Sequence, residues 1–237
     1  MVFTEQKANR SIFLLKTRRE IEAVLFDMDG VLADTVPAHI LAWNAALSEN
    51  DLPELDRSTY LIGLGRTNLD MLDKILDLYH KPFSLSNKKT MINKKERLFR
   101  EIIKKQITTT PGVVDWLDFF KQKQIRCSVA SSGEMANITV ILETLQISDY
   151  FTSIISGAHL PATKPDPMIF RLAAASLGVD PEKCMVIEDA PAGIKAAKSA
   201  GMFCCAIATT LPLNNLMQGD LRLENLAQVH PDTLFTD

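Results

Sequence analysis

Short apolar runs that end abruptly in polar residues recur along this chain, and helical patterns separate them. The runs are residues 23–26, 127–130, 185–187 and 203–207, with a weaker one at 151–155. A run of this length is typical of a strand that is buried on both faces of a parallel sheet. Between the runs, apolar residues recur with helical spacing at 113–123, 135–145, 167–177 and 192–200. This alternation predicts βαβ units, and therefore an α/β fold built on a parallel sheet.

A long segment without a strand pattern separates the first apolar run from the second. Its apolar residues recur at helical spacing in residues 40–47, 69–79 and 92–103. The segment is too long for a plain loop, so it predicts an inserted helical unit. We therefore expect three parts: an N-terminal extension over residues 1–20, a Rossmann-like three-layer core over residues 21–36 and 109–237, and an inserted α-helical cap domain over residues 37–108.

Charge and hydropathy exclude several classes of protein. The net charge of −3 over 237 residues gives no general attraction to nucleic acids or acidic membranes. No apolar run approaches the roughly 20 residues that span a bilayer. We expect a cytoplasmic protein, a monomer or weak dimer, with no nucleic acid and no membrane as partner. The basic residues before position 20 predict a solvated arm or an added helix, and an organelle-targeting peptide is the alternative.

The four cysteines have no spacing typical of a zinc site or a redox pair. Cys127, Cys204 and Cys205 lie within apolar runs, and Cys184 directly precedes one. We expect all four to be small core residues in a reducing compartment.

The first apolar run ends in Asp27-Met28-Asp29-Gly30, which carries two carboxylates two residues apart. Alternate residues of an extended chain point the same way, so Asp27 and Asp29 can converge on one cation. A divalent ion offsets their mutual repulsion, and all-oxygen ligands favour magnesium over zinc. Gly30 then allows the chain to turn sharply. The alternative is a loop whose aspartates cap a helix.

Polar residues also follow the other runs, and ligands of parallel sheets bind where the carboxyl ends of the strands meet. Glu188 and Asp189 follow one run and can complete the same metal site, although Asp189 alone is also typical of a helix N-cap. Lys164 lies in a loop stiffened by Pro165 and Pro167, where a cation can offset phosphate charge. On its own, a surface lysine is more often only solvated.

Ser131, Ser132 and Gly133 end the second run just before a helical segment. A hydroxyl and backbone N–H groups at a helix start form a natural phosphate cradle, so we expect these residues to contact substrate. A serine N-cap is the alternative, and it is compatible with phosphate binding.

Together these residues resemble the four motifs of the haloacid dehalogenase superfamily, in the β-phosphoglucomutase-like subgroup that carries a helical cap after its first strand. The similar segments occur in the family's order at residues 26–35, 130–132, 164–167 and 187–194. Each motif alone is weakly or moderately specific, whereas the ordered set is strong. The resemblance covers the chain from Ile21 to its C-terminus and leaves the first 20 residues outside.

The resemblance implies a phosphoryl-transfer enzyme with a role for each motif residue. Asp27 would be the nucleophile that forms an aspartyl-phosphate. Asp29 would be the general acid and base. Ser131 would bind the transferring phosphoryl group, and Lys164 would neutralise charge on that group and on Asp27.

The resemblance also implies a magnesium ion as cofactor. Its ligands would be Asp27, the backbone carbonyl of Asp29, and Asp189, with Glu188 nearby or bridging through water. Relatives that act as dehalogenases lack the second aspartate of the first motif, so Asp29 argues against that reaction.

Within the subgroup, the resemblance leaves two acceptors open for the phosphoryl group. The acceptor is water in a sugar-phosphate phosphatase and a second sugar hydroxyl in a β-phosphoglucomutase. Thr35 and His39 resemble the hinge and first cap helix of the mutase, although phosphatases of the group have similar segments. Arg66 resembles a cap-loop arginine that binds the distal phosphate, and a solvated arginine is the alternative.

Other residues favour the phosphatase. Mutases carry a Ser-Lys-Asn run after the second motif, whereas here Glu134 follows Gly133 and would repel a second phosphate. Ile62 replaces a lysine that mutases tend to place in the cap loop, and Lys94 or Lys95 are candidates to compensate. We therefore expect a magnesium-dependent phosphatase for a small phosphorylated metabolite, with the mutase second. A non-catalytic phosphate-binding or regulatory module is the alternative from another class.

Overall fold

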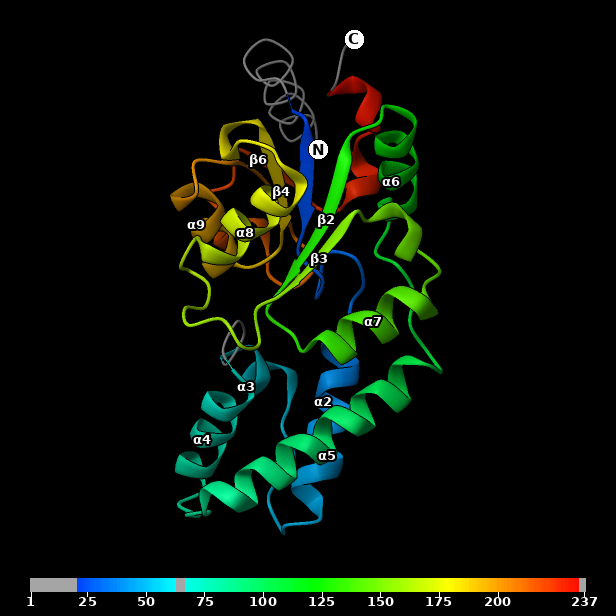
Figure 1. The fold of residues 1–237 in the computed structure, drawn as a ribbon. Helices are drawn as coiled ribbons and strands as arrows, with labels where there is room; N and C mark the ends of the chain where they lie inside the picture. The colour runs from blue at the N-terminus through cyan, green and yellow to red at the C-terminus, as the bar shows by residue number, and fades with distance from the viewer. Residues whose placement is uncertain (1–20, 63–66, 235–237) are drawn as a thin grey trace.

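A six-stranded sheet forms the centre of the larger part of the molecule (Figure 1). The computed structural model describes residues 21–62 and 67–234, so the basic extension and Arg66 lie outside the described residues. Across the sheet the strands follow the order β3-β2-β1-β4-β5-β6, and each neighbouring pair is parallel. The predicted α/β fold is confirmed. The strands are β1 (Ala23–Phe26), β2 (Arg126–Ser131), β3 (Ser153–Ser156), β4 (Cys184–Glu188), β5 (Phe203–Ile207) and β6 (Leu221–Leu223).

Helices cover both faces of the sheet because its strands are apolar on both sides. Val24 and Phe26 of β1 face α6 (Val113–Gln122) and α7 (Met135–Thr144) in one apolar cluster. The alternating residues Ala23 and Leu25 face the other helices in a second cluster. Those helices are α8 (Met168–Leu177) and α9 (Pro191–Ser199). The result is the three-layer core that the sequence predicts.

Four helices between β1 and α6 form a separate helical unit, which we refer to as the cap (Figure 1). They are α2 (Val36–Ser48), α3 (Arg57–Ile62), α4 (Asn68–Leu78) and α5 (Leu85–Ile103). The cap has its own apolar cluster, which includes Trp43, Leu47, Leu72 and Ile75. An inserted unit with its own core agrees with the helical insertion that the sequence predicts.

The cap also shares apolar contacts with the core domain. The apolar cluster that packs Val24 and Phe26 of β1 against α6 and α7 also includes residues of the cap. They are Ala38 and Ala42 of α2 and Phe99 and Ile103 of α5. Helix α5 runs beside α7, so a long cap helix and a core helix face each other directly (Figure 1). The boundary between cap and core is therefore partly apolar and closely packed.

Some elements differ from the sequence prediction for identifiable reasons. β6 has three residues and α3 has six, which is too short for a hydrophobic period to be recognised. α5 begins at Leu85, well before the start that the sequence predicts. The apolar spacing could not show this start, because the first half of the helix has few apolar residues. The side chain of Ser84 supplies the start signal, since it accepts a hydrogen bond from the backbone N–H of Asn87.

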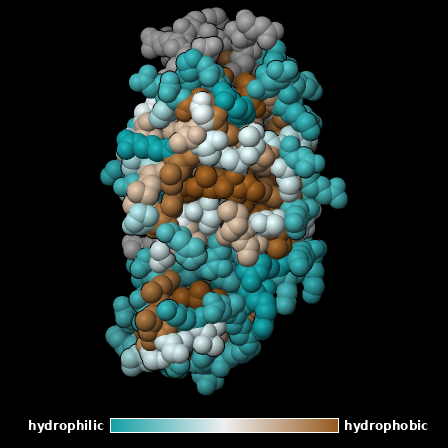
Figure 2. Space-filling model, in the orientation of Figure 1, coloured by the Kyte–Doolittle hydropathy of each residue, from teal (hydrophilic) through white to brown (hydrophobic). Residues whose placement is uncertain are grey.

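The surface seen in Figure 2 is mostly hydrophilic, with an apolar band over α8 and β3 and a smaller apolar area over α4. β3 ends the sheet, so its outer edge contributes to this band. All four cysteines are free and buried, as the sequence predicts. None of the helices within residues 21–62 and 67–234 is long and apolar enough to cross a membrane.

Candidate active site

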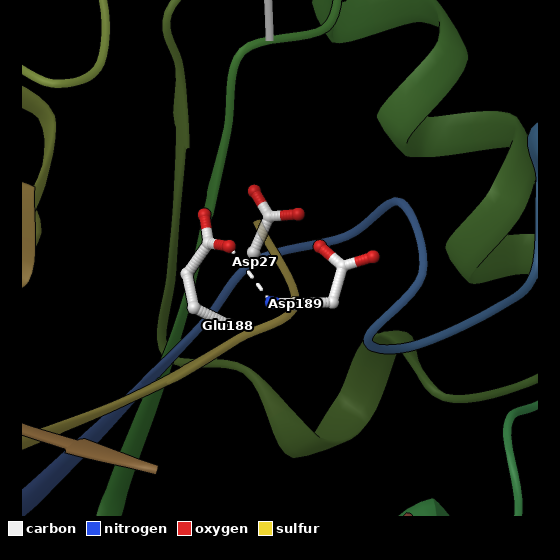
Figure 3. A group of neighbouring side chains, drawn as sticks. All are labelled: Asp27, Glu188 and Asp189. Carbon is white, nitrogen blue, oxygen red and sulfur yellow. Dashed lines mark hydrogen bonds between the residues drawn. The ribbon is translucent and has the colours of Figure 1, made fainter. Parts of the chain in front are cut away.

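The acidic residues of the first and fourth motifs meet at the carboxyl ends of β1 and β4. The two strands pair directly, with Phe26 opposite Ile187, so the residues that follow lie side by side. Asp27, Glu188 and Asp189 each offer a carboxylate oxygen, and these oxygens lie within 4.8 Å of one another. Figure 3 shows the three carboxylates on the same side of the strand ends. All three residues are buried.

Lys164 joins two of these carboxylates. Its Nζ atom lies 2.5 Å from Asp27 Oδ1 and 2.7 Å from Glu188 Oε1, and its side chain is buried. The other oxygen of Glu188 accepts backbone N–H bonds from Asp189 and Ala190, both at 2.8 Å. Because both of its oxygens are engaged, Glu188 fixes the position of the lysine next to Asp27.

The three carboxylates repel one another in this buried setting. Burial raises the pKa of Asp27 to about 7, Lys164 opposes this rise, and the charges of Glu188 and Asp29 add to it. Burial and the charges of Glu188 and Asp27 likewise raise the pKa of Asp189 well above its usual range. Burial disfavours the Lys164 ammonium, yet Asp27 and Glu188 together raise its pKa, so the lysine stays charged.

The donor set fits a small divalent cation. Asp189 Oδ2 is buried and has no hydrogen-bond partner of good geometry among the described residues, although the Thr210 hydroxyl lies close enough to lower the pKa of Asp189. Gly30 has φ +80 and lies so close to Asp189 Oδ2 that a Cβ there would be 1.8 Å from it. An unsatisfied buried carboxylate oxygen beside two further carboxylates is costly unless a cation binds. Hard oxygen donors of this kind match magnesium.

Asp29 points away from this acidic cluster and toward the cap. Its Oδ1 atom accepts a hydrogen bond of 2.5 Å from the Thr35 hydroxyl and lies 3.6 Å from His39 Nε2. Burial opposes ionisation of Asp29, but His39, Thr35 and the charge of Lys95 outweigh it and lower its pKa. Thr35 and His39 therefore both contact the Asp29 carboxylate, and their expected role in binding substrate stays a prediction.

Ser131 lies fully buried at the end of β2, and its Oγ atom accepts a 3.0 Å hydrogen bond from the backbone N–H of Gly133. Ser156 Oγ in turn donates to the Gly133 carbonyl at 2.6 Å. Ser132 is half-buried beside them. A small cavity between the cap and the core is lined by nine residues: Met28, Asp29, His39, Phe99, Ser131, Gly133, Asn137, Ile138 and Ile141. The second motif thus opens into the same space as Asp29.

Two residues near this cavity lack a sequence signal. The Tyr60 ring stacks on that of His39 with 6.0 Å between centroids. Burial raises the pKa of the Tyr60 phenol, and the negative charges of Asp29, Glu96 and Asp189 add to the rise, which puts the phenol close to the acidic site. Asn137 reaches the cavity from α7. Neither residue belongs to a motif, and only the packing of the cap on the core reveals them.

A buried carboxylate that is paired with a lysine and lies beside two further carboxylates, at the carboxyl edge of a parallel sheet, is typical of a phosphoryl-transfer enzyme. Comparison with known proteins agrees. The sequence profile described as Haloacid dehalogenase-like hydrolase matches residues 24–207. The chain belongs to this family.

Individual relatives identify the subgroup. The chain is 36% identical over 198 residues to a β-phosphoglucomutase of Bacillus subtilis, covering 81% of this chain and 86% of that protein. It is also 36% identical over 185 residues to a phosphorylated carbohydrates phosphatase of Thermotoga maritima, covering 77% and 82%. A crystal structure of β-phosphoglucomutase from Clostridium difficile matches with a TM-score of 0.80 and 31% identity, over 88% of this chain and 93% of that one. The expected β-phosphoglucomutase-like subgroup is confirmed.

Proposed function

We propose that this chain is a magnesium-dependent phosphatase that acts on a small phosphorylated metabolite, in particular a sugar phosphate, through an aspartyl-phosphate on Asp27. The observation that carries the proposal is the placement of Asp27 between the Lys164 ammonium, 2.5 Å away, and the unsatisfied Asp189 oxygen. The names of the two relatives that are 36% identical support a phosphorylated sugar as substrate.

Asp27, Asp189 and the backbone carbonyl of Asp29 would hold the magnesium ion, with Glu188 beside them. When bound, the ion supplies positive charge that stabilises the phosphoryl oxygens and screens the carboxylates from one another. Glu188 already accepts from Lys164 and from two backbone N–H groups, so its main role in our proposal is to hold the lysine in place.

In the first step, a carboxylate oxygen of Asp27 attacks phosphorus and the bond from phosphorus to the ester oxygen breaks. Before this step Asp29 takes up a proton, as the negative charge of the phosphate ester enters the cavity and offsets the contacts that lower its pKa. Asp29 then gives this proton to the departing ester oxygen, which leaves as an alcohol. Lys164 neutralises charge on Asp27 and on the transferring group, and the Ser131 hydroxyl binds one phosphoryl oxygen. Ser132 and Gly133 line the same side of the group.

In the second step, water attacks the phosphorus of the aspartyl-phosphate. Asp29, now ionised, accepts a proton from this water, and the bond between phosphorus and Asp27 breaks. Inorganic phosphate leaves with Asp27 and Asp29 restored to their starting states. The contacts of Asp29 with Thr35 and His39 support this role, because both hold its carboxylate at the cavity.

The charges around the cavity favour water over a second sugar phosphate as acceptor. Lys94 pairs with Glu49, and the buried Lys95 pairs with Glu96 at 2.6 Å. The charge of Glu134 also acts on Lys95, so this carboxylate lies close to the cap–core boundary. Two lysines that already have carboxylate partners contribute little to binding a second phosphate.

The mutase is the second candidate, supported by the 36% identity to a β-phosphoglucomutase and by the arrangement of Thr35 and His39 around Asp29. Its proposed distal phosphate ligand, Arg66, lies outside the described residues. In either case we propose that residues 37–108 act as a cap that closes over the site, and that the protein is a cytoplasmic monomer or weak dimer.

A substrate panel with magnesium tests the proposal. It contains hexose phosphates, nucleotides, and β-glucose 1-phosphate with and without a hexose bisphosphate primer. Release of inorganic phosphate that stops with a chelator and returns with magnesium supports the phosphatase. Isomerised sugar phosphate that forms only with the primer supports the mutase. Absence of both products across the panel contradicts the proposed function.

A further inference from the structure

A chain of buried polar side chains crosses the boundary between cap and core outside the motifs. Lys95 and Glu96 of α5 are 1% and 2% exposed, which is rare for charged residues. Lys95 Nζ lies 2.6 Å from Glu96 Oε1 and 2.9 Å from His39 Nδ1. The Lys95 ammonium also lies over the rings of Trp43 and Phe99. The pair is therefore fixed deep inside the packed boundary.

The two oxygens of Glu96 are divided between the two domains. Oε1 accepts from Asn68 Nδ2 at 2.8 Å, within the cap, as well as from Lys95. Oε2 accepts from the side-chain amide of Asn137 on core helix α7. Arg100, one turn further along α5, donates to Asn137 Oδ1 at 2.9 Å. Both ends of the Asn137 amide are thus held by α5, with donor and acceptor matched at each end.

The same helix controls the position of His39. The His39 ring stacks on Phe99 of α5 with 4.0 Å between centroids. Burial lowers the pKa of Lys95, and the carboxylate of Glu96, 2.6 Å away, opposes this and favours the ammonium. An ammonium can only donate, so His39 Nδ1 accepts from it, which leaves the neutral ring with its proton on Nε2, the atom that faces Asp29. A shift of α5 against the core therefore moves His39 relative to Asp29.

We infer that Glu96, Arg100 and Asn137 form a latch between cap and core that positions His39 against Asp29. The latch residues are positioning residues, because none of them belongs to the acidic cluster of Asp27, Glu188 and Asp189. Asn137 also lines the cavity, so the turnover readout is paired with a distance readout that a lost substrate contact would not change. Opening the cap separates Glu96 from Asn137, so the latch is complete only when α5 lies against α7. The inference rests on the proposed phosphatase reaction for one of its readouts, and the other readout does not need turnover.

The matched variants are Asn137→Ala and Asn68→Ala. The first removes the link from Glu96 to the core and leaves the Lys95–Glu96 pair inside the cap. The second removes a bond to the other oxygen of the same carboxylate, together with a 3.5 Å bond from Lys95 Nζ to Asn68 Oδ1, without crossing the boundary. If Glu96 only stabilised the fold and did not link cap to core, the two variants would have the same effect.

The turnover experiment measures kcat and KM of the full chain for its best phosphate ester with magnesium. Small displacements of positioning groups cost up to about a hundredfold in rate. We therefore expect Asn137→Ala to lower kcat by about tenfold or more, with Asn68→Ala near wild type. Arg100→Ala should lower kcat in the same way, and the Arg100→Ala/Asn137→Ala double variant should be little worse than either single one.

The second experiment measures the distance between spin labels on Lys89→Cys in the cap and Glu182→Cys in the core, two exposed positions. The four native cysteines are buried and resist labelling. With magnesium and beryllium fluoride as phosphate mimic, Asn137→Ala should broaden the distance distribution, and Asn68→Ala should not. Equal distributions in wild type and Asn137→Ala, or equal effects of the two variants, overturn the latch. If the wild type hydrolyses no ester, the proposed function fails and this measurement still decides the latch.

Discussion

The Lys164 ammonium lies 2.5 Å from Asp27 Oδ1 in a buried site. The proposed nucleophile thus has a cationic partner before any substrate is bound. The same ammonium lies 2.7 Å from Glu188, so one positive charge is shared by two carboxylates. The three carboxylates of Asp27, Glu188 and Asp189 therefore carry more negative charge than Lys164 can neutralise. A bound cation would supply the missing positive charge.

Asp27→Asn should abolish turnover and keep the fold. The amide has the shape of the carboxylate but is too poor a nucleophile to form the phosphorylated intermediate. Phosphate release and far-ultraviolet circular dichroism measure the two effects. The control is Asp115→Asn, an exposed aspartate of α6 outside the motifs, which should retain turnover. Full activity of Asp27→Asn would falsify the nucleophile assignment.

Lys164→Met should destabilise the protein as well as inactivate it. Methionine keeps the length of the side chain but leaves Asp27 and Glu188 buried without their shared cation. Breaking a buried ion pair in this way costs about 3 kcal/mol or more. Urea unfolding measures the free energy of unfolding, with Lys195→Met on the exposed surface of α9 as control. A loss no larger than that of the control contradicts the structural role of the pair.

The contribution of Asp27 to the stability of the metal-free protein should fall as the pH rises from about 4 to about 7. Burial and the neighbouring carboxylates raise the pKa of Asp27 from 3.8 to about 7. Between these values the folded state holds a proton on Asp27 that the unfolded chain has lost, so this contribution is greatest at low pH and falls as the pH rises. Asp189, whose pKa is also raised, acts in the same direction.

The measurement for this prediction is the melting temperature in chelator across that pH range, compared between wild type and Asp27→Asn. The variant lacks the titrating group, so its melting temperature minus that of wild type should increase with pH. Magnesium should raise the melting temperature of wild type most at the upper end of the range, because cation and proton compete for the same carboxylates. A difference that shrinks with pH rules out the raised pKa.

Asp29→Asn should slow turnover by about 10²–10⁴-fold through loss of proton transfer. The loss should be greater for an alkyl phosphate than for 4-nitrophenyl phosphate, whose leaving group needs no proton. Steady-state kcat for the two substrates checks this difference. An equal loss for both, or a change in KM alone, means that Asp29 is not the general acid.

Much of the site could be predicted from the sequence, because its polar residues directly follow the apolar runs that form the strands. Parallel strands bring their carboxyl ends to one edge, so the sequence predicts that Asp27 and Glu188 meet, and they lie within one cluster. The cap was predictable for a similar reason, since its helices keep an apolar period. The contacts of Lys164 with both Asp27 and Glu188 could not be predicted, because they depend on the path of the loop that carries the lysine.

The cap–core contacts could not be predicted from the sequence either. Glu96 and Asn137 are 41 residues apart, and nothing in either segment indicates that α5 lies against α7. The sequence offers Lys95 as a cation that could compensate for the phosphate-binding lysines of the mutases. Packing against Trp43 and Phe99 buries it instead, and that burial depends on tertiary contacts that no local pattern encodes.

Glu134→Lys should increase the affinity for a hexose bisphosphate. Glu134 precedes α7 without a side-chain capping bond, so the substitution breaks no hydrogen bond there. It replaces a repulsive charge with an attractive one near the cavity, and one charge-assisted hydrogen bond of about 1.5–3 kcal/mol corresponds to roughly a 10- to 150-fold change in affinity.

The inhibition constant of a hexose bisphosphate against phosphate release measures this change, with Glu134→Gln as the neutral control. The glutamine variant should lie between wild type and the lysine variant, because it removes the repulsion without adding a cation. Such a series means that Glu134 disfavours a second phosphate and so favours water as acceptor. Identical inhibition constants in the three proteins mean that Glu134 does not face the substrate, and the choice between phosphatase and mutase then depends on other residues of the cap.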